Sequence, residues 1–301
     1  MAAETGIAWT DSTHNPWWGC SKVGPACDHC YAEGVDRRTG ETHWGPGVPR
    51  RRVSEAARNE AYRWQKNADK FFAEHGRDRH VFTLSMGDLF DNEVEKQWRH
   101  DHMGVMEDCD RLKWQICTKR IGNLPKMIFP AWETAWPQHI GVLITVVTQA
   151  EADRDIPRLL DCKARFGIPW VGVSYEPAQE AIDFSRVCLA PKRPGSARSG
   201  IHIDALAGRY CESGMPYIGE WDINGPPPRR PRAHLDWIIF GGKSGPKWND
   251  RPFDLEWGRQ TRDRCTAAGV AFFMKQVAAF RPTHDMVPED LRIRQFPEAL
   301  L

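Results

Sequence analysis

The feature of this sequence that most constrains its fold is a series of short apolar runs separated by polar segments long enough to form helices. Continuous apolar runs that alternate with helical segments are typical of parallel strands covered on both faces. A further run, GIAWT at residues 6–10, is expected to form an earlier strand, which gives six or seven strands in all. The other runs lie at residues 81–87, 113–118, 139–148, 169–175, 237–242 and 270–275.

These elements predict an α/β fold in which about six parallel strands form a partial (β/α) barrel of the TIM type, with helices outside. A doubly wound open sheet is the alternative, because its sequence pattern is similar. We expect residues 1–301 to form a single domain. In either fold, functional side chains gather at the carboxyl ends of the strands. The residues expected there are Gly87, Asp88, Thr118, Lys119, Arg120, Thr145, Thr148, Ser174, Glu176 and Gly241 to Ser244.

Two segments depart from this alternation of strands and helices. Residues 39–52 are rich in Gly, Pro and Arg, and we expect a loop there, followed by a helical segment that Ser54 caps. Residues 188–233 contain Pro, Gly and Arg throughout, including three consecutive prolines, which predicts a long irregular insertion within the domain. The insertion is net basic, and segments of this kind either face a substrate or are disordered.

Three of the nine cysteines form a C-x6-C-x2-C motif at Cys20, Cys27 and Cys30, in a stretch rich in Gly and Pro. Thiolates bind soft or borderline metals, so these three residues are candidate metal ligands. Trp17 and Trp18 precede the motif, and aromatic side chains of this kind are expected to shield a metal site from water. The other six lie singly and are expected to be small buried apolar residues: Cys109, Cys117, Cys162, Cys188, Cys211 and Cys265.

The residues alone leave two metals open. Zinc requires a fourth ligand, for which His29, His14 or a distant cysteine is available, and no second pair of closely spaced cysteines exists. A 4Fe-4S cluster bound by three cysteines keeps one iron open. An open iron is a defect in an electron carrier, but it suits an enzyme whose substrate or cofactor coordinates the metal.

Net charge gives no reason to expect a tightly bound polyanion, because Lys plus Arg is 41 and Asp plus Glu is 40. No stretch approaches the roughly 18 to 20 consecutive apolar residues of a membrane span, and the N-terminus lacks the pattern of a signal peptide. We therefore expect a cytosolic protein without a membrane partner.

A resemblance to known proteins rests on five stretches of sequence: NPWWGCSKVGPACDHCYA, LSMGDLFD, ICTKR, VSYEP and WIIFGGKSGP. Together they resemble a phage-associated family of uncharacterised proteins that is similar to the radical S-adenosylmethionine (SAM) superfamily and reminiscent of spore photoproduct lyase. The resemblance covers most of the chain except residues 188–233, and it implies a single radical-SAM-like barrel domain. One departure is the first gap of the cysteine motif, because the usual motif of the superfamily is C-x3-C-x2-C.

The resemblance implies that Cys20, Cys27 and Cys30 each bind one iron of a 4Fe-4S cluster and leave the fourth iron to SAM. An electron from a reductant such as flavodoxin or ferredoxin would then cleave SAM to a 5'-deoxyadenosyl radical, which abstracts hydrogen from a substrate. The implied location is the cytoplasm of the bacterial host of a phage.

Cofactor contacts are also implied by the resemblance. Gly87 and Asp88 match the position that holds the amino group of SAM, and a carboxylate is a suitable acceptor for an ammonium. Thr145, Ser174 and Glu176 are implied to contact the ribose and carboxylate of SAM. All five residues follow expected strands.

Candidate catalytic residues are Cys117, as a hydrogen-atom donor, and Lys119. Lys119 and Arg120 follow an expected strand, where they are placed to bind a phosphate or carboxylate of the substrate. Lys243 and Lys247 are further candidates for binding a phosphate or carboxylate of the substrate. The leading substrate class is a nucleic acid or nucleotide, because Arg-rich loops and 14 tryptophans offer charge and stacking surfaces.

Two other functions are compatible with the sequence. The first is a non-catalytic adaptor that holds zinc or an iron–sulfur cluster and binds a host protein or nucleic acid. The second is a SAM-dependent methyltransferase on a doubly wound sheet, although the chain lacks the Gly-rich loop that such folds place after their first strand.

Overall fold

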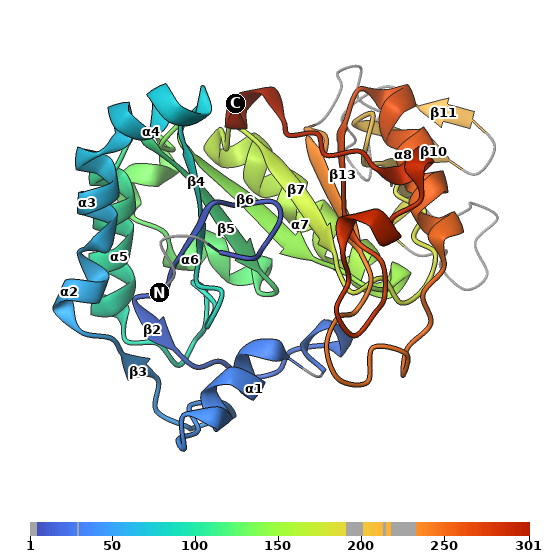
Figure 1. Cartoon of the computed structure of the whole chain (residues 1–301). Helices are drawn as coiled ribbons and strands as arrows, with labels where there is room; N and C mark the ends of the chain where they lie inside the picture. The colour runs from blue at the N-terminus through green and yellow to red at the C-terminus, as the bar shows by residue number, and fades with distance from the viewer. Residues whose placement is uncertain (1–4, 29, 191–200, 213–214, 218–232) are drawn as a thin grey trace. The chain divides into compact units, whose positions relative to one another are not determined.

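The computed structural model describes residues 5–28, 30–190, 201–212, 215–217 and 233–301 (Figure 1). The chain divides into two compact units. The first unit contains Met1–Ile144, Phe166–Pro169 and Glu298–Leu301. The second unit contains Thr145–Arg165 and Trp170–Pro297.

The first unit is built on four parallel strands in the order β1-β4-β5-β6. Every side chain of β6 is buried, as the apolar run at residues 139–148 predicts. A separate antiparallel pair is formed by β2 and β3, which lie before and after the first helix of the chain. The strands of this unit are β1 (Ser12–His14), β2 (Trp17–Trp18), β3 (Arg51–Arg52), β4 (Arg79–Thr83), β5 (Leu112–Thr118) and β6 (Ile140–Thr145).

Helices connect these strands, and Figure 1 shows α2 to α5 along one side of β4 and β5. The Ser54 hydroxyl accepts a hydrogen bond from the Ala57 amide at 3.4 Å, so the expected cap of the helical segment is confirmed. That segment is divided at Asn59 and Asn67. The helices are α1 (Tyr31–Arg38), α2 (Glu55–Arg58), α3 (Glu60–Lys66), α4 (Ala68–His75), α5 (Lys96–Asp108) and α6 (Leu124–Met127). Three short 3-10 helices are η1 (Pro25–Cys27), η2 (Ile121–Asn123) and η3 (Pro130–Glu133).

Strand β1 lies later in the chain than predicted. Residues 6–10 are irregular, whereas Ser12–His14 pair in parallel with β4. Trp9 nevertheless belongs to the core, because its ring lies 4.8 Å from that of Phe82. The expected strand at 6–10 is therefore wrong, although its apolar run does supply a core residue.

The second unit contains three parallel strands in the order β7-β12-β13. All residues of β7 and β12 are buried, which is typical of parallel strands covered on both faces. Helix α8 approaches β12 closely, because a Cβ atom at Gly258 would lie 2.7 Å from the Phe240 ring. The elements are α7 (Gln149–Phe166), β7 (Val171–Tyr175), β12 (Trp237–Gly241), α8 (Leu255–Ala268) and β13 (Ala271–Gln276), followed by the 3-10 helices η4 (His284–Met286) and η5 (Glu289–Leu291). The last 3-10 helix, η6 (Glu298–Leu300), belongs to the first unit.

The segment expected to be an irregular insertion contains regular structure. Four antiparallel strands lie in the order β11-β10-β9-β8. They are β8 (Val187–Ala190), β9 (Ile201–Asp204), β10 (Arg209–Glu212) and β11 (Met215–Tyr217). Most of the basic residues counted in the insertion lie outside the described residues, including Lys192, Arg193, Arg198, Arg229, Arg230 and Arg232.

The predicted α/β class, with parallel strands separated by helices, is confirmed. Within the described ranges, the parallel strands number seven, where about six were predicted. In the described part of the chain, no helix has the length and hydropathy needed to cross a lipid bilayer.

Candidate functional site

The three clustered cysteines lie in one loop of the first unit, between β2 and α1. Cys20 follows β2, Cys27 ends the 3-10 helix η1, and Cys30 is the N-cap residue of α1. Cys27 is buried, and the other two are half-buried. The amide of Val23 donates a hydrogen bond to Cys27 Sγ at 3.5 Å. We call residues 19–30 the cysteine loop.

A buried arginine anchors the cysteine loop. Arg120 Nη2 donates to the carbonyl oxygen of Ser21 at 2.8 Å, to its hydroxyl at 3.0 Å and to Cys20 Sγ at 3.6 Å. Arg120 is only 8% exposed, so its guanidinium lies within the protein. Contact of this residue with a substrate stays a prediction, whereas its contact with the loop is direct.

A second arginine, which the sequence analysis placed in a loop, completes this anchor. Arg50 is buried, and its Nε donates to Asp91 Oδ2 at 2.8 Å. Its terminal nitrogens donate to three backbone carbonyls of residues 43–48 and to the Ser21 hydroxyl. Asp91 also forms an ion pair with Arg120 at 3.5 Å. We call Arg50, Asp91 and Arg120 the buried ionic network.

Asp88 joins the loop after β4 to the loop after β5. Its carboxylate accepts hydrogen bonds from the Thr118 hydroxyl at 2.8 Å, the Lys119 amide at 3.1 Å and the Phe90 amide at 3.0 Å. Asp88 is buried, and three of its roughly four acceptor positions are therefore occupied.

Gly87 permits close approach of the same loop to the cysteine loop. A Cβ atom at this position would lie 3.1 Å from Trp17 Nε1 and 3.3 Å from the Gly19 carbonyl oxygen. Gly19 itself has a φ of 114°, and its amide donates to the Met86 carbonyl at 3.0 Å. The predicted cofactor residues Gly87 and Asp88 are thus beside the cysteine loop in the first unit.

Lys119 lies in the electrostatic field of several thiols. Burial lowers the pKa of its ammonium, but the combined effect of Cys117, Cys27, Cys30 and Asp88 raises the pKa above its ordinary value. In the described part of the chain, the ammonium makes no hydrogen bond or ion pair of its own. The Lys119 ammonium therefore lies within electrostatic range of Cys27, Cys30 and a fourth thiol, that of Cys117.

The thiol of Cys20 is protonated at neutral pH in this structure. Burial, with a smaller contribution from the Asp88 carboxylate, raises the pKa of Cys20 to about 12, although the charge of Arg120 acts in the opposite direction. Among the described residues, no three side chains of His, Cys, Asp or Glu are arranged to hold a metal ion. His29, a candidate fourth ligand for zinc, lies outside the described residues.

The predicted cofactor residues of the second unit also come together. The Val146 amide, next to Thr145, donates to the Ser174 carbonyl at 3.3 Å. The Ser174 hydroxyl lies 3.4 Å from Glu176 Oε2, and Glu176 forms an ion pair with Lys275 at 2.8 Å. Lys275 was not among the predicted site residues, because it is the penultimate residue of β13, an apolar strand.

Lys243 and Lys247 lie in the loop that follows β12. The ammonium of Lys243 binds Asp250 at 2.6 Å and is mostly buried. Lys247 is exposed and has a φ of 57°, a left-handed conformation that is uncommon outside glycine. Of the two predicted substrate residues, Lys247 is the one whose charge faces solvent.

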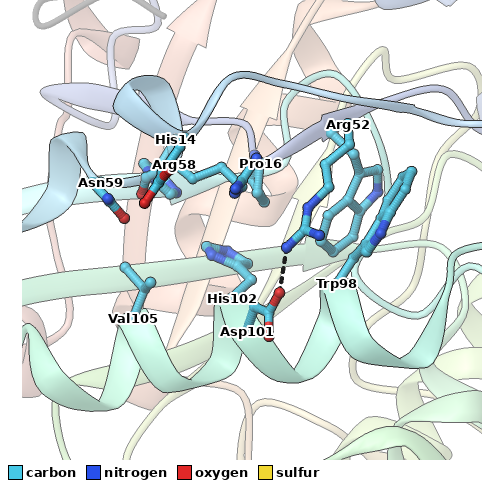
Figure 2. Close-up of a pocket in the computed structure, with 11 residues that line it drawn as sticks. His14, Pro16, Arg52, Arg58, Asn59, Trp98, Asp101, His102 and Val105 are labelled. Atoms are coloured by element: carbon cyan, nitrogen blue, oxygen red, sulfur yellow. Dashed lines mark hydrogen bonds and ion pairs between the residues drawn. The ribbon is translucent and has the colours of Figure 1, made fainter.

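The first unit also contains a pocket of about 180 Å³ (Figure 2). Its lining includes the imidazoles of His14 and His102, whose ring centroids are 5.1 Å apart. His14 Nε2 donates to the Arg58 carbonyl at 3.0 Å, and burial lowers the pKa of His14 to about 4. Figure 2 also shows an ion pair between Arg52 and Asp101. His14, another candidate zinc ligand, is thus a neutral residue of this pocket.

Comparison with known proteins identifies the family to which the chain belongs, but it does not identify a biochemical activity. No curated protein and no solved structure matches the chain. The model of a family described as a protein of unknown function, DUF5131, matches residues 4–295. Because this match covers nearly the whole sequence, the chain belongs to the DUF5131 family.

Proposed function

We propose that the protein is an iron–sulfur enzyme of the radical SAM type that acts on a nucleic acid or nucleotide. Cys20, Cys27 and Cys30 bind a 4Fe-4S cluster in this proposal, and the fold is a partial (β/α) barrel. The observation that carries the proposal is the contact of the buried Arg120 guanidinium with Cys20 Sγ, made while the same group holds Ser21.

The charges around the cysteine loop suit such a cluster. Three thiolates make the site negative, and hydrogen bonds and charges next to sulfur are the means by which proteins tune these centres. Arg120 is a direct donor to sulfur, and Lys119 lies in the field of Cys27 and Cys30. Because ligands commonly converge only when the metal binds, loading is expected to close the cysteine loop around the cluster.

The chain's own residues then orient the cofactor and the substrate. Asp88 retains about one free acceptor position, which is available to the ammonium of SAM. A role of Thr145, Ser174 and Glu176 in binding SAM stays a prediction of the resemblance. The cluster and SAM together supply a 5'-deoxyadenosyl radical, with electrons from a flavodoxin or ferredoxin, and the protein excludes water and positions the substrate.

Cys117 and Lys119 are the proposed catalytic residues. Cys117 is half-buried in β5, two residues before Lys119, and the pKa of Lys119 responds to its thiol. A thiol at this position is placed to donate a hydrogen atom, and the neighbouring ammonium to bind an anionic group of the substrate. We place this chemistry in the cytoplasm of a bacterium infected by a phage.

A zinc-binding adaptor is the second candidate, and one observation favours it. The thiols of Cys117, Cys27 and Cys30 all lie within electrostatic range of the same ammonium, which makes Cys117 a candidate fourth sulfur ligand. Four thiolates are a closed structural zinc set, which would leave no open position for SAM.

Metal analysis separates the two candidates. Anaerobic reconstitution of the 301-residue chain with iron and sulfide is expected to give a brown protein with about four irons per chain. Reduction with dithionite in the presence of SAM should then yield 5'-deoxyadenosine. Cys27→Ala should lose both iron and product, because one cluster ligand is gone.

Two further variants serve as controls for this experiment. Cys265→Ala replaces a buried cysteine of the second unit and should retain iron and product. Cys117→Ser should retain its iron if three cysteines bind the cluster, whereas a four-thiolate zinc site would lose its metal. A colourless protein with one zinc per chain would contradict the radical proposal.

A further inference from the structure

Two loops of the second unit lie side by side after β12 and β13. The Ala279 amide donates to the Lys243 carbonyl at 3.1 Å, and the Gly245 amide donates to the Phe280 carbonyl at 3.0 Å. Ser244 and Ala279 also form an isolated parallel bridge. Strands β12 and β13 are parallel neighbours, so both loops leave the same edge of the unit.

Each loop exposes an aromatic ring. Trp248 is 38% exposed and Phe280 is 54% exposed. Most other tryptophans of the chain are unavailable to a ligand, because eight of the 14 are buried. Among the described residues, the other exposed aromatic rings, Tyr31, Tyr62 and Phe72, lie in the first unit, so Trp248 and Phe280 are the exposed aromatic rings of the second unit.

Cationic groups stand next to both rings. The guanidinium of Arg281 lies over the Phe280 ring, 5.7 Å from its centroid. Lys247 precedes Trp248, is exposed and makes no ion pair within the described residues. The loop has two acidic residues: the carboxylate of Asp250 is held by Lys243 at 2.6 Å, and that of Asp254 accepts the Glu256 amide as the N-cap of α8. We call Lys247, Trp248, Phe280 and Arg281 the aromatic–basic surface.

We infer that the aromatic–basic surface binds a single-stranded nucleic acid. Bases stack on exposed aromatic rings regardless of sequence, while lysine and arginine track the phosphates. A duplex buries the faces of its bases, so rings at an exposed edge favour a single strand over a duplex. The inference rests on the proposed function for its substrate class, and it adds the surface and the strandedness.

The backbone holds the surface in place. The Lys247 carbonyl accepts the Asp250 amide at 3.2 Å, closing a tight turn around Trp248. At the end of the loop, the Phe253 ring stacks on Phe240 of β12, with centroids 5.6 Å apart. The loop is thus fixed to the core on both sides of Trp248, which limits the ordering entropy that binding must overcome.

Fluorescence anisotropy with a labelled single-stranded oligothymidylate tests the inference. Trp248→Ala and Phe280→Ala should each weaken binding by about 5-fold or more, because each removes a stacking partner. Lys247→Asn removes the charge and tolerates the left-handed backbone. The binding constant of this variant should depend less steeply on salt, with the magnitude of the slope of log K against log[salt] reduced by about 0.7. A matching duplex should bind more weakly than the single strand.

Phe72→Ala is the matched control, because Phe72 is 48% exposed and lies on α4 of the first unit. It should leave the Kd unchanged. Equal Kd values for wild type, Trp248→Ala and Phe280→Ala would overturn the inference, as would preference for the duplex. Melting curves of each variant show whether a weakened affinity reflects lost folding.

Iron analysis and the 5'-deoxyadenosine assay of the wild-type protein, set beside the binding measurement, distinguish this inference from the proposed function. If the protein binds no iron but the surface still binds the single strand, the radical function fails and the inference stands. If the cluster and 5'-deoxyadenosine form but Trp248→Ala binds like wild type, the inference fails alone.

Discussion

Asp88 carries two roles at once, one structural and one proposed. Its carboxylate holds the Thr118 hydroxyl and two backbone amides in the interior of the first unit. The cost of leaving buried donors unpaired is about 1–3 kcal/mol each, which makes the structural role large. A loss of activity on substitution would therefore not by itself show cofactor binding.

Asp88→Ala is expected to lower the free energy of unfolding by about 2–4 kcal/mol, because it leaves several buried donors without an acceptor. Urea denaturation measures this change. Asp69→Ala is the control, since the Asp69 side chain is 94% exposed and its loss should cost well under about 1 kcal/mol.

Asp88→Asn separates the two roles. It keeps one acceptor oxygen and the volume of the side chain, so it should retain most of the stability while weakening SAM binding in calorimetry. An unchanged SAM affinity would remove Asp88 from the cofactor site.

The residues that could be predicted from the sequence belong to a short motif, whereas the missed residues depend on partners far away in the chain. The cysteine motif is visible because three thiols lie within eleven positions. Arg50 and Arg120 were placed in loops, because their partners Ser21 and Asp91 lie between 29 and 99 positions away. A buried arginine looks like a surface arginine until its distant carboxylate is known.

At the scale of elements, apolar runs predicted the strands well where burial depends on apolar side chains. Strand β1 was misplaced because its residues are polar, yet they are buried through specific partners. Arg79 Nη1 donates to the Ser12 hydroxyl at 2.8 Å, and His14 donates to the Arg58 carbonyl. Hydrogen bonds to residues far along the chain replace the apolar pattern that the sequence analysis depends on.

Gly242 allows the loops after β12 and β13 to meet. A Cβ atom there would lie 2.3 Å from the Ala278 amide nitrogen, a backbone atom that cannot rotate away. Gly242→Ala should therefore lower the melting temperature and weaken the aromatic–basic surface, as thermal denaturation and anisotropy would show.

Gly104→Ala is the matched control for this substitution. Gly104 lies inside α5, and an added Cβ atom would meet nothing within 4 Å. The change should raise stability by about 0.5–1 kcal/mol, because alanine favours the helix. A stable Gly242→Ala protein would show that the two loops are not packed as described.

At the scale of the whole molecule, the α/β class and its parallel strands followed from the alternation of apolar runs and helical segments. The insertion was expected to be irregular, but it contains four antiparallel strands. Short strands in a segment rich in Pro and Gly give a weak pattern, because few alternating positions are available to reveal them.

Three buried histidines make the stability of the fold dependent on pH. Burial lowers the pKa of His14 and of His80 to about 4, and it lowers the pKa of His102 well below its usual value. The unfolded chain therefore binds more protons than the folded chain below about pH 6.5. The stabilisation is complete above that pH and is lost as the pH falls toward 4.

Urea denaturation should show unfolding free energy falling on acidification, by up to about 1.4 kcal/mol per pH unit for each histidine in this window. His80→Gln should make the decline shallower, because one titrating group is removed and a side-chain amide can still donate to the Leu300 carbonyl. His75→Gln, at an exposed histidine, should leave the slope as it is. Stability that rises on acidification would contradict the buried neutral state.

The buried ionic network also fixes an order of events during synthesis. Arg120 is joined to Ser21 across 99 positions, so a growing chain presents its clustered thiols well before their guanidinium partner exists. At typical elongation rates of about 5–20 residues per second, this interval is roughly 5 to 20 seconds. Non-local contacts form only after the intervening chain has closed. The cysteine loop therefore stays exposed to chaperones and oxidants throughout that interval, and a metal delivered then meets thiols without their guanidinium.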